Sequence, residues 1–125
     1  MHDLIKAIKA LSDETRLRIL NILLERECCV CEVMQALDIS QSRASRNLGI
    51  IQEAGFVKVR REGAWMLYSV DWETANRYAA SLSRLLKELE VEDEILKKDL
   101  ERLRTSVKVG PGCATKTSFV EVTSK

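Results

Sequence analysis

The sequence is poor in proline, histidine, glycine and aromatic residues. Its 125 residues include one proline, one histidine, five glycines, and two each of Trp, Tyr and Phe. It has no apolar run long enough to span a bilayer and no signal-peptide core at its N-terminus. We therefore expect a single cytoplasmic domain whose core is aliphatic and whose thiols stay reduced.

The sequence also lacks the features of a thiol enzyme and of a histidine-based zinc site. It has no Cys-x-x-Cys followed by a βαβ pattern and no glycine-rich anion loop. Its only histidine is His2, and the carboxylates at helical spacing in residues 71–104 have no histidine among them. A zinc site of that type would need both kinds of ligand. We therefore interpret Glu88, Glu92 and Asp99 as a solvated face that pairs with lysines and arginines.

Cysteine, by contrast, is concentrated at one point of the chain. Cys28, Cys29 and Cys31 lie within four residues, and Cys113 is the fourth cysteine. The first three are too close together to form a useful structural crosslink, and disulfides are rare in a reducing compartment. Soft thiols gathered in this way favour a thiophilic ion.

The spacing of these cysteines limits how they could meet in a regular helix. Residues three apart share a helix face, as Cys28 and Cys31 would, whereas Cys29 and Cys31 would point about 200° apart. Three thiolates on one ion would require the start of the helix to unwind, and such a distortion could act as a switch. A helix N-terminus lowers thiol pKa values, but the carboxylates of Glu27 and Glu32 act in the opposite direction.

Hydrophobic periodicity predicts four helices, a β-hairpin and a long C-terminal helix. Asp13 and Ser40 are expected N-caps, and Gly55 suits the position after a helix end. Residues 1–104 would form the domain, and residues 105–125 a flexible tail that carries Cys113. The expected helices are 4–11, 14–24, 30–37, 41–54 and 71–104, and the expected strands are 56–61 and 64–70.

Basic side chains cluster in one part of a chain whose net charge is only +1. Residues 41–61 contain five basic residues and one acidic residue, a local excess typical of a DNA-contacting face. The helix in this region would enter the major groove and the hairpin would follow the flanking backbone. The alternative is a solvated amphipathic helix. The candidate DNA-contacting residues are Gln41, Ser42, Arg43, Ser45, Arg46, Asn47, Lys58, Arg60 and Arg61.

The apolar stripe of the long C-terminal helix bears on assembly. Leucines and isoleucines recur from Leu82 to Leu103, well past the hairpin. The stripe could cap the core of a monomer, but much of it would lie exposed unless a second subunit covered it. We expect a homodimer, formed through the first and last helices, that reads a palindromic operator in double-stranded DNA.

The order of the expected elements is that of a winged helix-turn-helix. With the segments LSDETRLRIL (11–20) and SQSRASRNL (40–48) and a wing that contains Arg-Arg-Glu-Gly, the chain resembles the ArsR/SmtB family of metal-responsive repressors over residues 4–104. The resemblance implies a mainly α fold with a β-hairpin wing. It also implies the function of a DNA-binding transcriptional repressor and not that of an enzyme.

The cysteines resemble those of the arsenic-responsive branch, in which a Cys-Val-Cys pair begins the third helix. Cys29 and Cys31 match that pair, and the resemblance implies that they bind As(III) or Sb(III) as the inducer and thereby release the operator. The usual third thiol of the branch falls at Met34, a weaker donor. Cys28 or Cys113 would then complete the site.

The four cysteines also permit other functions. A repressor of the same fold could sense oxidants through a disulfide, or Cd(II) or Pb(II) through its four sulfurs. A thiol redox enzyme is the alternative from a different class, and the missing motifs described above argue against it.

Overall fold

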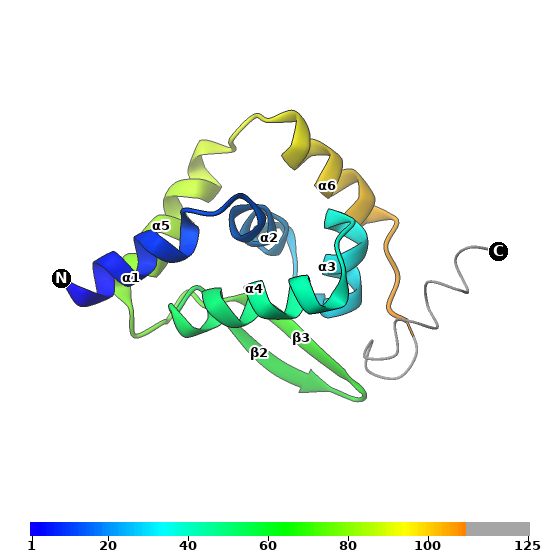
Figure 1. Cartoon of the computed structure of the whole chain (residues 1–125), viewed down its shortest axis with the longest axis horizontal. Helices are drawn as coiled ribbons and strands as arrows, with labels where there is room; N and C mark the ends of the chain where they lie inside the picture. Colours follow the sequence, from blue (N-terminus) through cyan, green and yellow to red (C-terminus); the bar gives the residue numbers. More distant parts are fainter. Residues whose placement is uncertain (110–125) are drawn as a thin grey trace.

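A group of helices carries a β-hairpin that extends from one side of it (Figure 1). The computed structural model describes residues 1–109 of the chain. It confirms the predicted winged helix-turn-helix, in which the third and fourth helices form the helix-turn-helix and the hairpin forms the wing. The elements are α1 (His2–Leu11), α2 (Glu14–Glu25), β1 (Cys28–Cys29), α3 (Val30–Leu37), α4 (Gln41–Glu53), β2 (Val57–Glu62), β3 (Trp65–Val70), α5 (Arg77–Leu89) and α6 (Glu94–Arg104).

The helix boundaries follow the capping residues that the sequence indicated. The Asp13 carboxylate accepts a hydrogen bond from the backbone N–H of Arg16 at the start of α2. The Ser40 hydroxyl accepts one from Arg43 at the start of α4, at 3.2 Å. Each such cap stabilises its helix by about 1 kcal/mol. After α4, Gly55 has φ +95°, and a Cβ there would lie 2.6 Å from a neighbouring side chain, so this position requires glycine.

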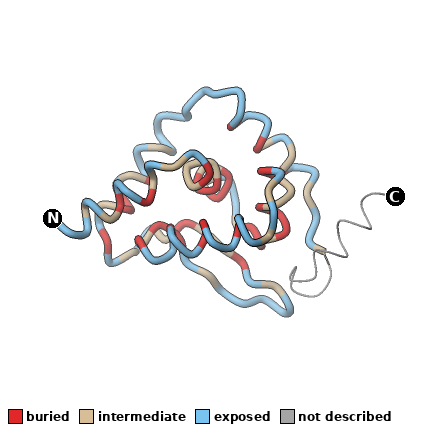
Figure 2. The backbone as a smooth tube through the Cα atoms, in the orientation of Figure 1, coloured by how far each residue is buried: buried red, intermediate tan, exposed pale blue. Residues whose placement is uncertain are grey.

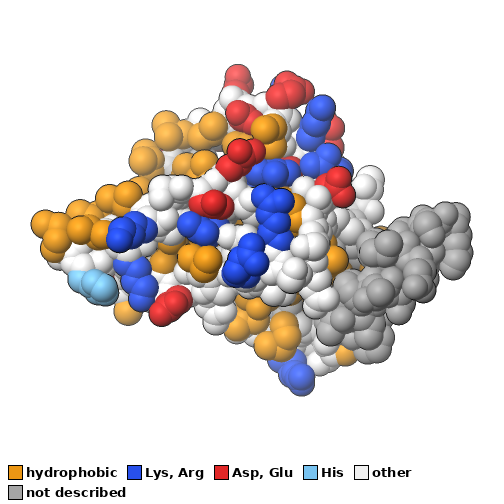
Figure 3. All heavy atoms as spheres, in the orientation of Figure 1, with side chains coloured by type: hydrophobic (Ala, Val, Ile, Leu, Met, Phe, Trp, Pro, Cys, Tyr) orange, Lys and Arg blue, Asp and Glu red, His pale blue; other side chains and the backbone are white. Residues whose placement is uncertain are grey.

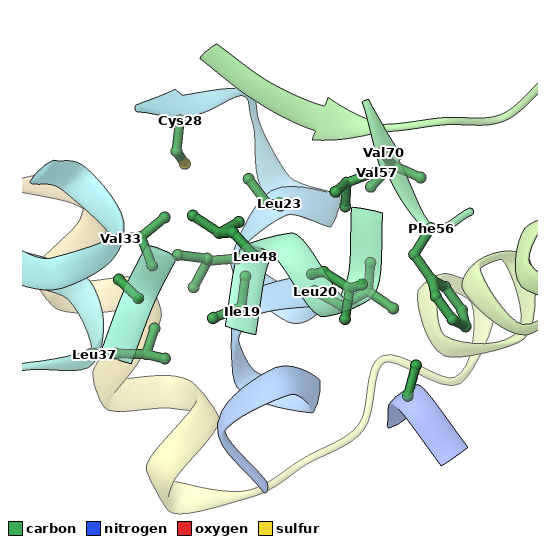
Figure 4. Packing of buried hydrophobic residues seen from close by; sticks show 14 of the residues in the cluster. Ile19, Leu20, Leu23, Cys28, Val33, Leu37, Leu48, Phe56, Val57 and Val70 are labelled. Atoms are coloured by element: carbon green, nitrogen blue, oxygen red, sulfur yellow. The ribbon is translucent and has the colours of Figure 1, made fainter. Parts of the chain in front are cut away.

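The core is aliphatic, as the composition predicted, and α2 lies at its centre (Figure 2). Ile19 and Leu20 of α2 are fully buried in one cluster with Val33 of α3 and Leu48 of α4 (Figure 4). Among residues 1–109, Phe56 is the largest side chain that is fully buried. Burial of such a side chain contributes about 1.5–3 kcal/mol. Because α3 and α4 share this core with α2, the helix-turn-helix is fixed relative to the body.

A short strand before α3 was not predicted from the sequence. β1 pairs antiparallel with β3, which also pairs with β2, so that a three-stranded sheet has the order β1–β3–β2. Cys29 lies opposite Leu67, and Leu67 lies opposite Arg60. Two residues are too few for an alternating pattern to indicate a strand. The open edge of the hairpin decides the pairing, because it satisfies backbone groups that β1 would otherwise leave unbonded.

The C-terminal helix is divided, and the prediction of one helix over residues 71–104 is wrong. α5 begins only at Arg77 and ends before Glu90, whose φ of 47° is left-handed. Asp93 then caps α6 by accepting hydrogen bonds from two backbone N–H groups of its first turn. The break turns α6 back over the body, where it packs on α2 and α3 (Figure 1). Within the described residues, no helix is both long and apolar enough to cross a membrane.

Asp99 is not part of a solvated face, contrary to the prediction. Its side chain is 0% exposed and accepts two hydrogen bonds from Arg18, at 2.8 and 2.9 Å, and one from Arg102, at 3.0 Å. The same two guanidinium groups donate to the carbonyl oxygens of Leu37 and Ala36, the last residues of α3. This Asp99 cluster (Asp99, Arg18 and Arg102) ties α2 and α6 to the C-terminal end of α3.

Residues 105–109, which the sequence assigned to the flexible tail, lie along α3 instead. Gln35 of α3 donates a hydrogen bond to the carbonyl oxygen of Val107 at 2.7 Å and accepts one from its backbone N–H at 3.1 Å. We call residues 105–109 the cover segment. The remainder of the predicted tail, with Cys113, lies outside the described residues.

Candidate functional site

Two of the predicted ligand thiols meet at the junction of β1 and α3. Cys29 is the N-cap of α3 and has extended backbone angles (φ −89°, ψ 170°), whereas Cys31 lies in the first helical turn. Their Sγ atoms are 2.8 Å apart, and both side chains are buried. Within a regular helix Cys29 and Cys31 could not meet, but Cys29 precedes α3 and its sulfur therefore reaches that of Cys31.

Cys28 is directed away from this pair. Neighbouring residues of a strand point to opposite faces of a sheet, and the Cys28 side chain enters the main core with Leu23 and Val33 (Figure 4). Its Sγ lies 3.4 Å from the carbonyl oxygen of Arg26. Among residues 1–109, no three His, Cys, Asp or Glu side chains come together as a metal site. The described part of the chain therefore brings together two of the predicted thiols, and Cys113 lies outside it.

The carboxylates that flank the thiols are engaged by other groups. Glu32 is buried, accepts a hydrogen bond from the backbone N–H of Cys29 at 2.9 Å and pairs with Arg26 at 3.2 Å. Glu27 accepts two hydrogen bonds from Arg60 of the wing, both 2.8 Å long, and these lower the pKa of Glu27. Both carboxylates are therefore structural, since Glu32 caps α3 and Glu27 links the loop before β1 to the wing.

Burial controls the protonation of the thiols. It raises the pKa of Cys29 to about 11 and that of Cys28 to about 12. At Cys29, the loss of solvation outweighs the backbone hydrogen bonds of the helix start, which act to lower the pKa. The sequence left this balance open. At neutral pH both groups are protonated thiols, which are poor nucleophiles.

The cover segment lies over the thiol pair. The backbone N–H of Val109 donates to the Cys31 Sγ at 3.4 Å, and that Sγ lies 3.8 Å from the carbonyl oxygen of Val107. Val109 also packs with Leu67 of β3 in the small cluster that contains both thiols. The thiols therefore lie between the wing sheet and the cover segment.

The N-terminal turns of α4 expose most of the side chains that were predicted to contact DNA. Gln41 is partly buried, and the inward-facing Ala44, Leu48 and Ile51 are fully buried, as predicted. The arrangement is that of an amphipathic recognition helix with its polar face open. The side chains exposed on this face are Ser42, Arg43, Ser45 and Arg46.

Asn47 is the exception on α4, because it is buried and not presented to a base edge. Only 5% of it is exposed. Its side-chain oxygen accepts a hydrogen bond from Arg16 at 3.1 Å, and its amide donates to the Arg43 carbonyl oxygen at 2.9 Å. Arg16 also donates to the Ala10 carbonyl oxygen at 2.6 Å. Asn47 therefore joins α4 to α2 and to the end of α1.

The predicted cations of the wing differ in their surroundings. Lys58 and Arg61 are exposed on β2. Arg60 is exposed as well, but it forms ion pairs with Glu27 at 2.8 Å and with Glu62 at 3.0 Å. A phosphate would have to compete with two carboxylates for Arg60, which makes it the weakest of the three as a DNA contact.

The sequence patterns did not indicate Gln35 or Arg26 as residues that support the site. A signal for Gln35 was present, because it follows Cys31 by four residues and such residues share a helix face. No comparable signal existed for Arg26. Its guanidinium reaches Glu32 and also the carbonyl oxygen of Leu103, which lies 77 positions away.

Comparisons with known proteins agree with this architecture. The sequence model described as "Bacterial regulatory protein, arsR family" matches residues 13–59. The cadmium resistance transcriptional regulatory protein CadC homolog of Staphylococcus aureus is 43% identical over 72 residues, which are 57% of this chain and 60% of that protein. The arsenical resistance operon repressor of Escherichia coli K12 is 45% identical over 65 residues, 51% of this chain and 56% of that protein. The chain thus spans less than two thirds of each of these curated relatives.

A solved structure extends the likeness to most of the fold. It is the homodimeric winged helix-turn-helix DNA-binding domain of a possible ArsR-family transcriptional regulator from Mycobacterium bovis. The TM-score is 0.61 at 29% identity, over 71% of this chain and 79% of that one. The family match spans α2, α3 and α4, which together form the core of the helix-turn-helix. Over residues 13–59 the chain therefore contains the helix-turn-helix domain of the ArsR family of bacterial regulatory proteins.

Proposed function

We propose that this chain is a DNA-binding transcriptional repressor that releases its operator when Cys29 and Cys31 bind trivalent arsenic or antimony. The observation that carries the proposal is the close approach of the Cys29 and Cys31 side chains, with Sγ atoms 2.8 Å apart, at the start of α3. Thiols are the ligands that soft ions prefer. The pair also adjoins both elements that would contact DNA. The arsenical resistance repressor of E. coli supports the proposal as a relative.

The protonated state of the Cys29 thiol is compatible with this ligand. Each cysteine, in its reduced form, would replace one hydroxyl group of arsenous acid, and the thiol proton would leave with that hydroxyl as water. No thiolate has to exist beforehand in the buried site, where burial holds the pKa of Cys29 at about 11. Two such exchanges would leave one ligand position of the ion for a third group.

Cys113 is a better candidate for a third sulfur than Cys28. The Cys28 thiol lies in the main core on the other face of the sheet. Cys113 follows Val109 by four residues, and the Val109 nitrogen lies 3.4 Å from the Cys31 Sγ. Four residues span at most about 14 Å, so the chain length permits Cys113 to return to the thiol pair.

The proposed DNA contact places α4 in the major groove and the wing along the adjacent backbone. Arginine side chains of α4 can pair with guanine, while serine hydroxyls and the helix N-terminus suit phosphates. Asn47 is left out because it is buried, and Arg60 because two carboxylates hold it. The proposed contacts are Gln41, Ser42, Arg43, Ser45, Arg46, Lys58 and Arg61.

A homodimer would place two copies of this DNA-contacting surface on a palindromic operator. Ile5 and Ile8 of α1 are 45% and 52% exposed, and Leu85 and Leu89 of α5 are 47% and 59% exposed. α1 and α5 contact each other, and apolar side chains gather over this end of the molecule in Figure 3. A second copy would bury this surface. The homodimeric M. bovis domain supports this assembly, in which half-sites would lie about 10 base pairs apart or a multiple of that.

Two routes would carry a change at the thiols to the DNA-contacting elements. Along the chain, α3 runs from the thiols to the turn at Asp38, which leads into α4. Across the sheet, β1 pairs with β3 of the wing, and Glu27 binds Arg60. The recognition helix and the wing would therefore respond together. Coupling of this kind typically amounts to about 1–3 kcal/mol.

A DNA-release titration tests the proposed function directly. Fluorescence anisotropy of the protein on its own promoter fragment would be followed during addition of arsenite, antimonite, cadmium and zinc. We expect release by arsenite and antimonite at micromolar concentration, with zinc inert. Release by cadmium alone would assign the site to Cd(II), as the name of the S. aureus relative suggests. Tight DNA binding that is indifferent to all four ions would reject an ion-sensing thiol site.

The salt dependence of DNA binding should distinguish the cations of the wing. Arg61→Ala is expected to lower the slope of log K against log salt concentration by about 1, because one phosphate contact is lost. Arg60→Ala should change the slope by much less, since Glu27 and Glu62 already neutralise that guanidinium. Equal changes in the two slopes would show that Arg60 exchanges its carboxylates for phosphate on the operator.

A further inference from the structure

Thr15 lies outside the proposed set of DNA contacts but binds the side chain of Arg43, which belongs to that set. We propose that Thr15 is a positioning residue that orients the Arg43 guanidinium before DNA arrives, so that Arg43 reads a base edge. The inference rests on the proposed function for the DNA contact itself, but it requires neither the thiols nor any effector.

A buried hydroxyl in the first turn of α2 holds the end of an exposed arginine of α4. The Nη2 of Arg43 donates a hydrogen bond to the Thr15 Oγ1 at 2.8 Å. Thr15 is 5% exposed, whereas Arg43 is exposed. A buried hydroxyl requires a hydrogen-bond partner, and the Arg43 guanidinium supplies it from the surface. The bond therefore fixes the far end of this arginine against the body of the domain.

The backbone of Arg43 is held from the same turn of α2. The Asn47 amide donates to the Arg43 carbonyl oxygen at 2.9 Å, and the Asn47 oxygen accepts a hydrogen bond from Arg16 at 3.1 Å. Arg16 also donates to the Ala10 carbonyl oxygen at 2.6 Å, which fixes its own position. Because Thr15 and Arg16 are neighbours in the chain, one turn of α2 holds Arg43 at both its backbone and its guanidinium. Such support keeps a binding side chain in one orientation.

Arg46 provides the contrast, because it shares the exposed face of α4 but lacks this support. Within residues 1–109, its side chain forms no hydrogen bond or ion pair. DNA must therefore order the Arg46 side chain on binding, and the lost rotamer freedom weakens the contact. Arg43 has lost that freedom beforehand, and its guanidinium keeps further N–H donors for a ligand after Thr15 has accepted one.

A fixed guanidinium suits a base edge better than a phosphate. It can present two N–H groups to the O6 and N7 acceptors of guanine, which lie in a fixed plane. Residues at the N-terminus of a recognition helix are those that contact base edges, and Arg43 lies in the first turn of α4. Arg43 is thus the base-reading arginine of α4, and Arg46 is a phosphate contact.

DNA binding of the full chain without arsenite tests this role. Thr15→Val keeps the branched shape of the side chain and removes the hydroxyl, whereas Thr15→Ser keeps the hydroxyl. Fluorescence anisotropy would give the affinity for the promoter fragment and for DNA of unrelated sequence. We expect Thr15→Val to bind the promoter fragment about fivefold more weakly than wild type, because Arg43 must then be ordered on binding. Its affinity for unrelated DNA should be unchanged, and Thr15→Ser should resemble wild type.

A double-mutant cycle shows through which arginine Thr15 acts. The effect of Thr15→Val should vanish in an Arg43→Ala background and persist at about fivefold in an Arg46→Ala background. A residue that only supports the fold would have the same effect in both backgrounds. That result would overturn the proposal, and so would equal weakening of Thr15→Val on the promoter fragment and on unrelated DNA.

Nuclear magnetic resonance of the DNA-free protein supplies a measurement that needs no variant of Thr15. The heteronuclear NOE of the Arg43 Nε–H, assigned by its disappearance in Arg43→Lys, reports motion on the ps–ns timescale. We expect a value close to that of the ordered backbone at Arg43 and a much lower value at Arg46. Equally low values at the two arginines would overturn the proposal.

This inference and the proposed function fail in different ways. If wild type prefers its promoter fragment and Thr15→Val binds it equally well, the inference is wrong and the repressor proposal stands. If arsenite does not release the promoter fragment, the proposed effector is wrong, and the Thr15 variants still decide the inference. A wild type without preference for its promoter fragment over unrelated DNA would overturn both.

Discussion

Replacement of Cys29 or Cys31 by serine is expected to abolish release of operator DNA by arsenite while the DNA affinity without arsenite stays within about twofold of wild type. A serine hydroxyl is a hard oxygen donor, and it cannot replace a thiol toward a soft ion. Neither residue lies on the exposed face of α4 or on the outer strand of the wing. The lost coupling of about 1–3 kcal/mol corresponds to a factor of roughly 5–150 in DNA affinity. Anisotropy with and without arsenite measures it.

Cys28→Ser is the matched control for this experiment. The residue adjoins Cys29 in the chain, but its side chain lies in the main core on the opposite face of the sheet. The variant should lose about 1–3 kcal/mol of stability, because a hydroxyl is placed in apolar surroundings, and it should still respond to arsenite. A protein that carries both Cys29→Ser and Cys31→Ser and is still released by arsenite would eliminate the thiol pair as the effector site.

Asp99→Ala should destabilise the fold more than any other single change to a carboxylate of the C-terminal helices. Asp99 is 0% exposed and forms ion pairs with Arg18 at 2.8 Å and with Arg102 at 3.0 Å. Removal of one partner from a buried ion pair typically costs about 3–5 kcal/mol, because the remaining charge is left unpaired. Urea denaturation monitored by circular dichroism would give the difference in the free energy of unfolding.

Glu88→Ala provides the comparison for Asp99→Ala. Both carboxylates belong to the same C-terminal region, and both had been assigned to a solvated face, but Glu88 is exposed. Its replacement should change stability by no more than about 0.5 kcal/mol. Two variants of equal stability would contradict the buried network and restore the original interpretation of Asp99 as a surface residue.

Local sequence patterns were sufficient for the first four helices and the hairpin, for a physical reason. Helical and strand periodicity concerns residues a few positions apart, and caps such as Asp13 and Ser40 bind backbone groups of their own helix. The single long helix was predicted from the same kind of pattern. It failed because the leucine spacing continues across a segment where Glu90 ends one helix and Asp93 caps the next.

The close approach of Cys29 and Cys31 could not be predicted from the sequence. Cys29 and Cys31 stand out in the sequence because soft ligands are adjacent to a predicted recognition helix. Their convergence depends on β1, which places Cys29 in an extended conformation opposite Leu67 of a hairpin that begins almost thirty residues later. No pattern within residues 27–33 contains that information.

The sequence by itself determined the first four helices and the hairpin, the positive charge of residues 41–61 and the concentration of cysteine at residues 28–31. Only the tertiary structure decided which polar residues face inward. Asp99 is buried by Arg18, 81 positions away, and Asn47 by Arg16, 31 positions away. Burial depends on partners that folding brings together from distant parts of the chain, whereas periodicity records only near neighbours.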